Sequence, residues 1–286
     1  MIKKRILRLK KLIIKYNLDG YIVPKNDYYF SEFSSPDRLK AITNFSGSAG
    51  FAIVFIKENF LFVDGRYSTQ ANIECGKKFK IIEVPRQFQK KFLRIKRNKL
   101  VLGFDPKLFT SFFLEKSLGK KFVLRPINKN LVDEVVKNKE KIVKTQFYSL
   151  SEKITGESIK SKINKLIKLL KKQRIDNIFI SAPENVAWIL NIRGNDVPNS
   201  PIPNCRLIIS KTKKIILISK IKKCEKLLNE GIIKIHQLID ENKITQTILN
   251  LKGKKFIIDK NSCSIYYENL IKSKFRILDK EDPTYY

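Results

Sequence analysis

The most constraining stretch of this 286-residue chain is residues 44–71, where two apolar runs flank a short polar loop. The block opens with Ser46-Gly47-Ser48-Ala49-Gly50, whose two glycines allow backbone angles that other residues avoid. Residues 51–56 are too few for an independent helix and fit a strand buried on both faces. Residues 60–63 return as a second strand, and Asp64 can cap a following helix. The block therefore predicts a hairpin followed by a capped helix.

This block also resembles a known family. The segments F-S-G-S-A-G-F-A at residues 45–52 and L-F-V-D-G-R-Y-S-T-Q-A at residues 61–71 resemble the N-terminal domain of Xaa-Pro aminopeptidases (aminopeptidase P), relatives of creatinase and prolidase. The segment A-W-I-L-N-I-R-G-N-D-V-P at residues 187–198 is similar to the second domain of the longer, three-domain members. Two motifs in this order imply the first two domains of such an enzyme.

Predicted strands and helices alternate along the chain, which is typical of an α/β (α+β) fold with helices packed on a sheet. The second half repeats the first: L-D-G-Y-I-V at residues 18–23 corresponds to I-D-N-I-F-I at residues 175–180, and N-F-S-G at residues 44–47 corresponds to N-I-R-G at residues 191–194. We therefore expect two tandem creatinase-N-terminal-like domains, at residues 1–150 and 151–286. Each should be a mixed β-sheet flanked by helices.

The net charge of +32, from 59 Lys and Arg against 27 Asp and Glu, is the unusual feature of the composition. A field of this sign attracts nucleic acid or anionic membranes. The alternative is compositional, because lysines are scattered along every segment, as in proteins from AT-rich genomes, and no nucleic-acid-binding signature gathers them. We favour the compositional interpretation, which predicts no nucleic-acid partner and no membrane partner.

Cysteine usage and the first residues bear on the compartment. The four cysteines are widely spaced and form no C-x-x-C pair, which fits ordinary thiols in a reducing compartment better than a disulfide framework. The basic start at residues 1–5 is followed by no long apolar segment of the kind that signal peptides carry. We therefore expect a cytoplasmic protein.

The family resemblance also implies a third domain, of pita-bread fold, in which two Asp, one His and two Glu bind two divalent ions, typically manganese, that activate a bridging water. This chain has one histidine, His236, and nothing similar to the family's His-Gly motif or paired Glu segments. We therefore expect the catalytic domain to be absent here. The chain should then hold no catalytic residue, no metal ligand and no cofactor, and should be inactive by itself.

Several polar residues beside turns are better explained by structure than by catalysis. Asp64 and Asp105 precede Gly and Pro, as capping and turn residues do. Ser46 and Ser48 lie beside glycines, with no histidine near them in the sequence that could activate a hydroxyl. We expect all four to stabilise turns.

Other polar residues are candidates for a domain interface or a substrate-facing surface: Arg38, Asp64, Arg66, Trp188, Arg193 and Asp196. The best candidate is the segment 193–196, because polar residues after an apolar helix are costly to bury unless they are paired. An internally paired loop is an alternative of equal weight. If the segment faces a catalytic domain, Ile192, Val197 or residues 198–203 should be unusually exposed, and Arg193 or Asp196 should lack a partner within its own domain.

Two hypotheses from different classes follow. The first is the non-catalytic portion of an Xaa-Pro aminopeptidase, which caps the substrate cleft, restricts it to short peptides with proline second, and aids assembly into a homodimer. Its partner is the catalytic pita-bread domain or a copy of it. The second is an inert peptidase-like module whose positive charge binds acidic protein or nucleic acid.

Overall fold

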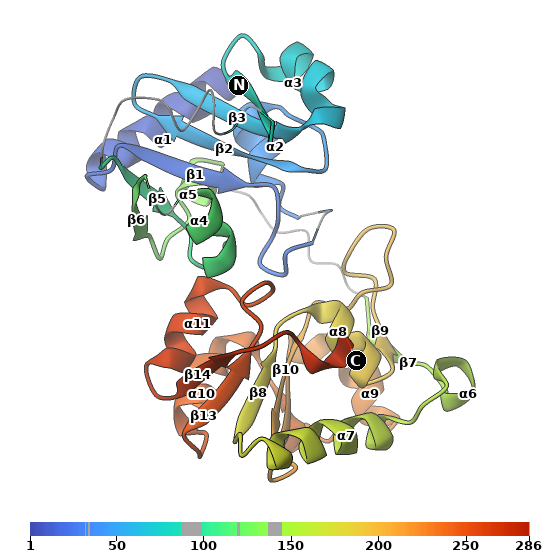
Figure 1. The fold of residues 1–286 in the computed structure, drawn as a ribbon. Coiled ribbons are helices and arrows are strands. Elements are labelled where there is room, and N and C mark those ends of the chain that lie inside the picture. Colours follow the sequence, from blue (N-terminus) through green and yellow to red (C-terminus); the bar gives the residue numbers. More distant parts are fainter. Residues whose placement is uncertain are drawn as a thin grey trace. The chain divides into compact units, whose positions relative to one another are not determined.

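The computed structural model describes residues 1–31, 33, 35–86, 88, 99–118, 121–136 and 145–285. The chain divides into two compact units, unit 1 (Met1–Lys141) and unit 2 (Ile142–Tyr286), each with its own sheet (Figure 1). The boundary precedes the predicted one at 150/151 because Phe147 is fully buried in the core of unit 2. In addition, β7 (Tyr148–Ser149) pairs with β9 (Ile192–Arg193).

Unit 1 contains a six-stranded sheet in the order β4-β3-β2-β1-β5-β6. The strands are β1 (Gly20–Pro24), β2 (Gly50–Phe55), β3 (Asn59–Asp64), β4 (Lys80–Val84), β5 (Val101–Phe104) and β6 (Val123–Pro126). Strands β1, β2 and β3 are antiparallel neighbours, whereas β3/β4, β1/β5 and β5/β6 are parallel. The predicted hairpin is the pair β2–β3, with Ile53 opposite Phe60.

Helices cover both faces of this sheet. They are α1 (Ile2–Lys15), α2 (Arg38–Thr43), the 3-10 helix η1 (Gly65–Tyr67), α3 (Ser68–Cys75), α4 (Ser111–Ser117) and α5 (Leu131–Val136). Helix α1 buries the stripe Ile6, Leu9 and Ile13 in one core together with residues of α2, α3 and α5. Helix α4 covers the other face, where the Phe113 ring packs edge-on to Phe51. The basic segment at residues 88–96, whose sequence predicts a helix, lies almost entirely outside the described residues.

Unit 2 repeats this architecture. Its sheet has the order β12-β11-β10-β8-β13-β14, and its strands are β8 (Asn177–Ile180), β10 (Arg206–Ser210), β11 (Ile215–Ile218), β12 (Leu238–Ile239), β13 (Lys255–Ile258) and β14 (Arg276–Asp279). Each neighbouring pair has the same direction as its counterpart in unit 1. The apolar residues at positions 232–235 form no strand, and the edge strand is β12.

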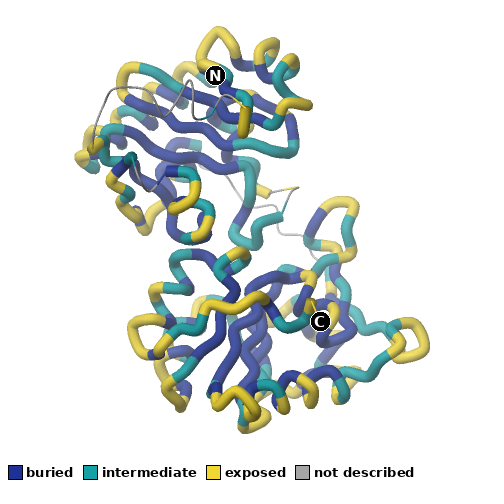
Figure 2. The backbone as a smooth tube through the Cα atoms, in the orientation of Figure 1, coloured by how far each residue is buried: buried dark blue, intermediate teal, exposed yellow. Residues whose placement is uncertain are grey.

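The helices of unit 2 also lie on both faces. They are α6 (Glu152–Thr155), α7 (Ile159–Lys172), α8 (Pro183–Ile189), η3 (Ile221–Lys223), α9 (Glu225–Asn229), η4 (Ile235–Gln237), η5 (Glu241–Lys243), α10 (Ile244–Asn250), α11 (Ile265–Lys272) and η6 (Pro283–Tyr285). One core joins the sheet to α7, α8 and α9, and another joins it to α10 and α11. The central strands β1, β2, β8 and β10 are almost entirely buried, whereas the edge strands β6 and β14 are not (Figure 2).

The tandem repeat predicted from the sequence is confirmed, and it extends to single residues. Helices α1 and α7 each have 14 residues and are followed by a residue of positive φ, Asn17 (φ 51) and Arg174 (φ 54). Next, the carboxylates of Asp19 and Asp176 accept backbone N–H groups at the start of β5 and β13 respectively. The predicted fold class, two tandem mixed sheets flanked by helices, is therefore correct. None of the described helices is long and apolar enough to cross a membrane.

Candidate functional site

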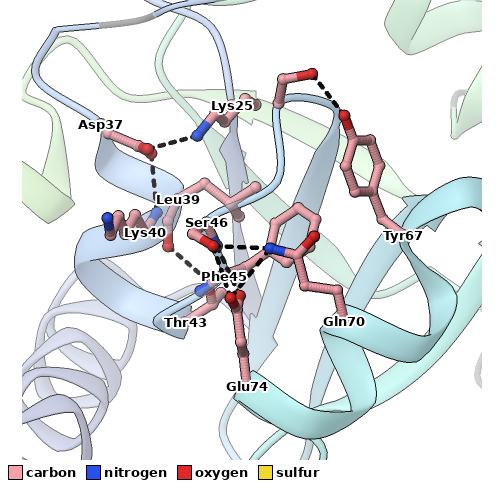
Figure 3. Close-up of polar contacts among 11 residues, drawn as sticks. Lys25, Asp37, Leu39, Lys40, Thr43, Phe45, Ser46, Tyr67, Gln70 and Glu74 are labelled. Carbon is pink, nitrogen blue, oxygen red and sulfur yellow. Dashed lines mark hydrogen bonds and ion pairs between the residues drawn. The ribbon is translucent and has the colours of Figure 1, made fainter.

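The turn that opens residues 44–71 is locked to helix α3 by side-chain hydrogen bonds (Figure 3). Ser46 donates from its backbone N–H and from Oγ to the carboxylate of Glu74, at 2.8 and 2.6 Å. Gln70 Nε2 donates to Ser46 Oγ and to Glu74 Oε1. Partial burial raises the pKa of Glu74, but the hydrogen bonds from Ser46 and Gln70 outweigh it and leave that pKa lowered. Ser46 is thus a tether between a turn and a helix.

Packing explains the two glycines of this turn. A Cβ on Gly47 would lie 2.3 Å from the ring of Phe45. Gly50 has a φ of 153°, and a Cβ there would lie 2.6 Å from the carbonyl oxygen of Phe62. The hydroxyl of Ser48 is 2.9 Å from that of Tyr67. The motif that carries the family resemblance therefore stabilises the fold, as expected for Ser46 and Ser48.

Asp64 and Arg66 form a local, exposed cap. The Asp64 carboxylate accepts from the backbone N–H and from Nε of Arg66, both at 2.9 Å, at the start of η1. These bonds lower the pKa of Asp64. The side chains are 44% and 75% exposed, so they remain accessible to a partner. Their function at an interface stays a prediction.

Arg38 is an internal residue of unit 1. Its side chain is 2% exposed, and Nε and Nη2 donate to the two carboxylate oxygens of Asp133 at 2.9 and 2.7 Å. The guanidinium carbon lies 4.7 Å from the centre of the Tyr28 ring. This burial corrects the expectation that Arg38 faces an interface or a substrate. Arg38 instead joins α2 to α5, on which Asp133 lies.

Polar residues also gather where parallel strands end, the place where α/β sheets often bind ligands. In unit 1, Asp105 follows β5 and accepts from the Lys107 N–H and from Asn130 Nδ2, both at 2.9 Å. Burial raises the pKa of Asp105 despite these bonds. Because its oxygens are occupied by internal donors, Asp105 acts as a structural acceptor, as its position before a proline predicts.

Unit 2 places an acidic pair at the same edge. The carboxylate of Asp259, after β13, accepts from the backbone N–H groups of Asn261 and Asp282 at 2.8 and 3.0 Å. Asp282 in turn accepts from Asn185 Nδ2 at 2.9 Å and from the Thr284 N–H at 3.0 Å. Burial raises the pKa of Asp282. Both carboxylates therefore accept hydrogen bonds from groups of their own unit, as Asp105 does.

Trp188 is half-exposed and lies against a buried lysine. The Lys162 ammonium is 4.1 Å from the Trp188 ring centre and donates to Trp188 O and Asn191 Oδ1 at 2.8 and 2.7 Å. Lys162 is 2% exposed, and desolvation lowers its pKa. It therefore caps the carboxyl end of α8. In the sequence, the available sign of this burial is that Lys162 lies next to Ile163 in a predicted helix. Lysine is so abundant in this chain that Lys162 did not stand out as a buried cation.

Arg193 and Asp196 both have partners in unit 2. Arg193 Nη1 donates to the carbonyl oxygens of Ile192 and Ala187 at 2.8 and 3.3 Å. The Asp196 side chain is 1% exposed, forms an ion pair with Lys223, and accepts from the Asn204 N–H. The expectation that one of them lacks a partner is therefore wrong. Satisfying these polar groups internally is what allows Asp196 to be buried.

Exposure of the same segment differs from the expectation in part. Ile192 and Val197 are buried, whereas the following loop is exposed at Pro198, Asn199 and Pro201. The segment thus combines an internally fixed base with an accessible loop. Of the two alternatives for residues 193–196, the internally paired loop is correct.

Comparison with known proteins identifies the family to which the two domains belong. Residues 5–133 and residues 138–286 each match a family described as the creatinase/prolidase N-terminal domain. The chain belongs to this family. A "Probable Xaa-Pro aminopeptidase P" of Aspergillus fumigatus is 33% identical over 75% of this chain and 35% of that protein. "Xaa-Pro aminopeptidase 1" of Dictyostelium discoideum is 28% identical over 99% of this chain and 48% of that protein.

One solved structure shows the same fold over both creatinase/prolidase N-terminal domains. The X-prolyl aminopeptidase of Caenorhabditis elegans, described as a cytosolic enzyme with a di-nuclear active site, matches with a TM-score of 0.85. The match covers 98% of this chain and 50% of that one at 20% identity, so the likeness concerns the fold. This chain spans half or less of the length of these relatives.

The creatinase/prolidase family raises the question of a metal pair, and the described residues do not fit one. They contain no group of three or more His, Cys, Asp and Glu side chains that could hold a metal ion. His236 is exposed in η4. All four cysteines are buried, and burial raises the pKa of Cys75 to about 11 and of Cys224 to about 12, so neither thiol is ready to ionise as a ligand.

Proposed function

We propose that this chain is the non-catalytic, N-terminal two-domain portion of an Xaa-Pro aminopeptidase. The observation that carries the proposal is the 98% coverage of the chain by half of an X-prolyl aminopeptidase structure, at a TM-score of 0.85. Both creatinase/prolidase N-terminal matches fall within that half-length. The polar clusters of the described residues are occupied by internal partners and offer no metal set. Peptide hydrolysis would therefore be carried out by residues outside positions 1–286.

In the intact enzyme these two domains would cap the substrate cleft of the catalytic pita-bread domain. Capping restricts the cleft to short peptides with proline second and excludes folded proteins. The accessible loop at residues 198–201 and the half-exposed Trp188 ring provide unit 2 with groups that can contact a further domain. The two divalent ions, expected to be manganese, would belong to that further domain.

The test is a peptidase assay of the purified 286-residue chain with Mn²⁺ and a short peptide that has proline second. We expect no turnover above that of a chelator-treated sample, because the described residues contain no ligand set that could activate water. The positive control is a full-length Xaa-Pro aminopeptidase in the same buffer. Proline-specific hydrolysis that needs Mn²⁺ and is absent with chelator would contradict the proposal.

We further propose a cytoplasmic location and assembly into a homodimer. The location is supported by the description of the Caenorhabditis elegans enzyme as cytosolic and by the four reduced, buried cysteines. Light scattering coupled to gel filtration would test the assembly. A single species with the mass of one chain at all concentrations would mean that residues 1–286 do not dimerise by themselves.

A further inference from the structure

Helix α1 presents a basic face that the fold of unit 1 does not use. Residues 1–18 contain seven Lys and Arg and no Asp or Glu. Five of these cations are exposed: Lys3, Lys4, Arg8, Lys11 and Lys15. None of the five forms an ion pair with any residue that the structure describes. The positive charge of this face is therefore available to a partner.

Two large aliphatic side chains lie within the same face. Leu7 is 52% exposed and Ile14 is 56% exposed. They are seven residues apart, so they differ by only about 20° around the helix axis and stand about 10 Å apart along it. At 100° per residue, Lys3 lies on one side of this pair and Lys11, Lys4 and Lys15 lie on the other. The exposed face thus combines an apolar line with flanking cations.

The repeat supplies a control within the molecule. Aligned end to end, α7 also exposes five cations: Lys160, Lys165, Lys168, Lys171 and Lys172. In α7 the positions equivalent to Leu7 and Ile14 are Asn164 and Lys171. One of its cations, Lys165, is already paired with Glu157. Two helices with the same number of exposed cations therefore differ in whether aliphatic groups accompany them.

The composition predicted no membrane partner, but the exposed face of α1 combines cations with aliphatic groups. We therefore propose that this face docks on the surface of a bilayer containing anionic phospholipid. Lysines and arginines are attracted to anionic headgroups, and a pair of aliphatic side chains can enter the boundary between headgroups and acyl chains. A nucleic acid would satisfy the cations but would leave Leu7 and Ile14 against phosphates and water. The face therefore fits an anionic bilayer better than a nucleic acid.

Co-sedimentation of the full chain with vesicles tests the proposal. We expect binding to vesicles of equal parts phosphatidylcholine and phosphatidylserine, and none to phosphatidylcholine alone. Replacing the five exposed α1 cations by Gln should weaken binding at least about 100-fold. The matched variant, with the five exposed α7 lysines replaced by Gln, changes the net charge equally and should bind nearly as well as the unmodified chain. Equal losses in the two variants would show that binding follows net charge and would overturn the proposal.

The decisive variant gives α1 the residues of α7, Leu7→Asn together with Ile14→Lys. It raises the positive charge by one, so a purely electrostatic site should bind vesicles more tightly. Loss of the two aliphatic groups should instead weaken binding about tenfold. Far-UV circular dichroism verifies that each variant is folded. Unchanged or tighter vesicle binding by this variant would overturn the proposal, as would binding of the unmodified chain to duplex DNA but not to anionic vesicles.

Discussion

Units 1 and 2 solve the same structural problem with different residues. In each unit a side chain of the 14-residue helix, α1 or α7, donates to a carbonyl group at the end of the next helix, α2 or α8. In unit 1, Arg5 Nη1 donates to Ala41 O at 2.9 Å, and in unit 2, Lys162 Nζ donates to Trp188 O at 2.8 Å. The two cations occupy equivalent positions in α1 and α7. Both units thus have a donor at this helix position, a guanidinium group in unit 1 and an ammonium group in unit 2.

The strand-end clusters differ more strongly. Unit 1 joins its elements through the charged pair Arg38–Asp133, whereas unit 2 uses a hydrogen bond from the amide of Asn185 to Asp282. Counting back from Asn44 and Asn191, which follow α2 and α8 and both have positive φ, places Arg38 and Asn185 at equivalent positions. Unit 1 therefore depends on a buried charge where unit 2 depends on an amide.

The turns that follow these helices show where unit 2 has been elaborated. A Cβ on Gly194 would lie 2.8 Å from Phe147 and 2.9 Å from Pro203, so Gly194 is as sterically required as Gly47. In unit 1, β2 begins soon after Gly47, at Gly50. In unit 2, residues 195–205 intervene before β10, and they supply the exposed loop. The added segment is the part of the repeat best suited to a function that only unit 2 performs.

The largest difference in lost unfolding free energy should appear between Arg38→Ala in unit 1 and Asn185→Ala in unit 2. Arg38→Ala removes a buried cation from a bidentate pair and should lower the unfolding free energy of unit 1 by about 3 kcal/mol. Asn185→Ala removes a neutral donor and should cost unit 2 about 1–2 kcal/mol. Urea unfolding followed by circular dichroism reports both units, whereas fluorescence of Trp188, the only tryptophan of the chain, reports unit 2.

These signals also provide the control. Arg38→Ala should leave the Trp188 transition unchanged, and Arg38→Lys should recover little, since lysine cannot form the bidentate pair. Equal losses from Arg38→Ala and Asn185→Ala would mean that the charge at position 38 adds nothing to an ordinary hydrogen bond.

Lys162→Met should have the next largest effect. It leaves Trp188 O and Asn191 Oδ1 without their donor in the core of unit 2, which should cost about 2 kcal/mol. The emission of Trp188 should also change, because the ammonium group that lies over its ring is lost. The matched variant Arg5→Met, at the equivalent position of α1, should leave the Trp188 signal unaltered. If the urea midpoint of the Trp188 fluorescence transition is the same in Lys162→Met as in the unmodified chain, the capping function of Lys162 is refuted.

Asp176→Asn should lower the stability of unit 2 by about 1 kcal/mol at neutral pH. Burial raises the pKa of Asp176, but hydrogen bonds from Lys211 and from the N–H groups of Lys254 and Lys255 outweigh it and lower the pKa to about 2. A lowered pKa favours the folded state above the unfolded pKa of about 4, and this contribution is lost as the pH falls toward 2. Asp282, whose pKa is raised by burial, acts in the opposite sense.

The informative quantity is therefore the difference in the unfolding free energy of unit 2 between the Asp176→Asn variant and the unmodified chain. Measured by Trp188 fluorescence in urea, this difference should be largest at neutral pH and shrink on acidification to about pH 2. Asp19→Asn, at the equivalent position of unit 1, should leave the Trp188 transition unchanged. A difference that stays constant with pH would exclude the ionised carboxylate as its source.

Ser46→Ala should have the smallest effect, below about 1 kcal/mol, because its hydrogen bonds to Glu74 lie at the exposed surface. The backbone N–H remains to bind Glu74, so the turn should stay attached to α3. Circular dichroism in urea should detect a small shift, and the Trp188 fluorescence transition of unit 2 should stay unchanged. A loss as large as that of Arg38→Ala would mean that the turn is needed for unit 1 to fold.

Local patterns in the sequence determined much of this protein. The apolar runs at residues 51–56 and 60–63 predict the β2–β3 hairpin because a short turn brings adjacent segments together. The helical spacing of Ile6, Leu9 and Ile13 predicts α1. The internal repeat predicts two similar domains. Each of these inferences depends on residues that are close in sequence.

The pairings of the candidate site were decided only by the tertiary structure. Arg38 and Asp133 are far apart in the sequence, as are Asp196 and Lys223, and nothing local to either residue indicates its partner. For Arg193 and Asp196 the sequence therefore left two alternatives of equal weight, an open interface and an internally paired loop. The fold supplies carbonyl groups for Arg193 and a lysine for Asp196, which satisfy them. The unit boundary moved for the same reason: Phe147 is placed by the core it enters, and burial in a core is a property of the whole chain.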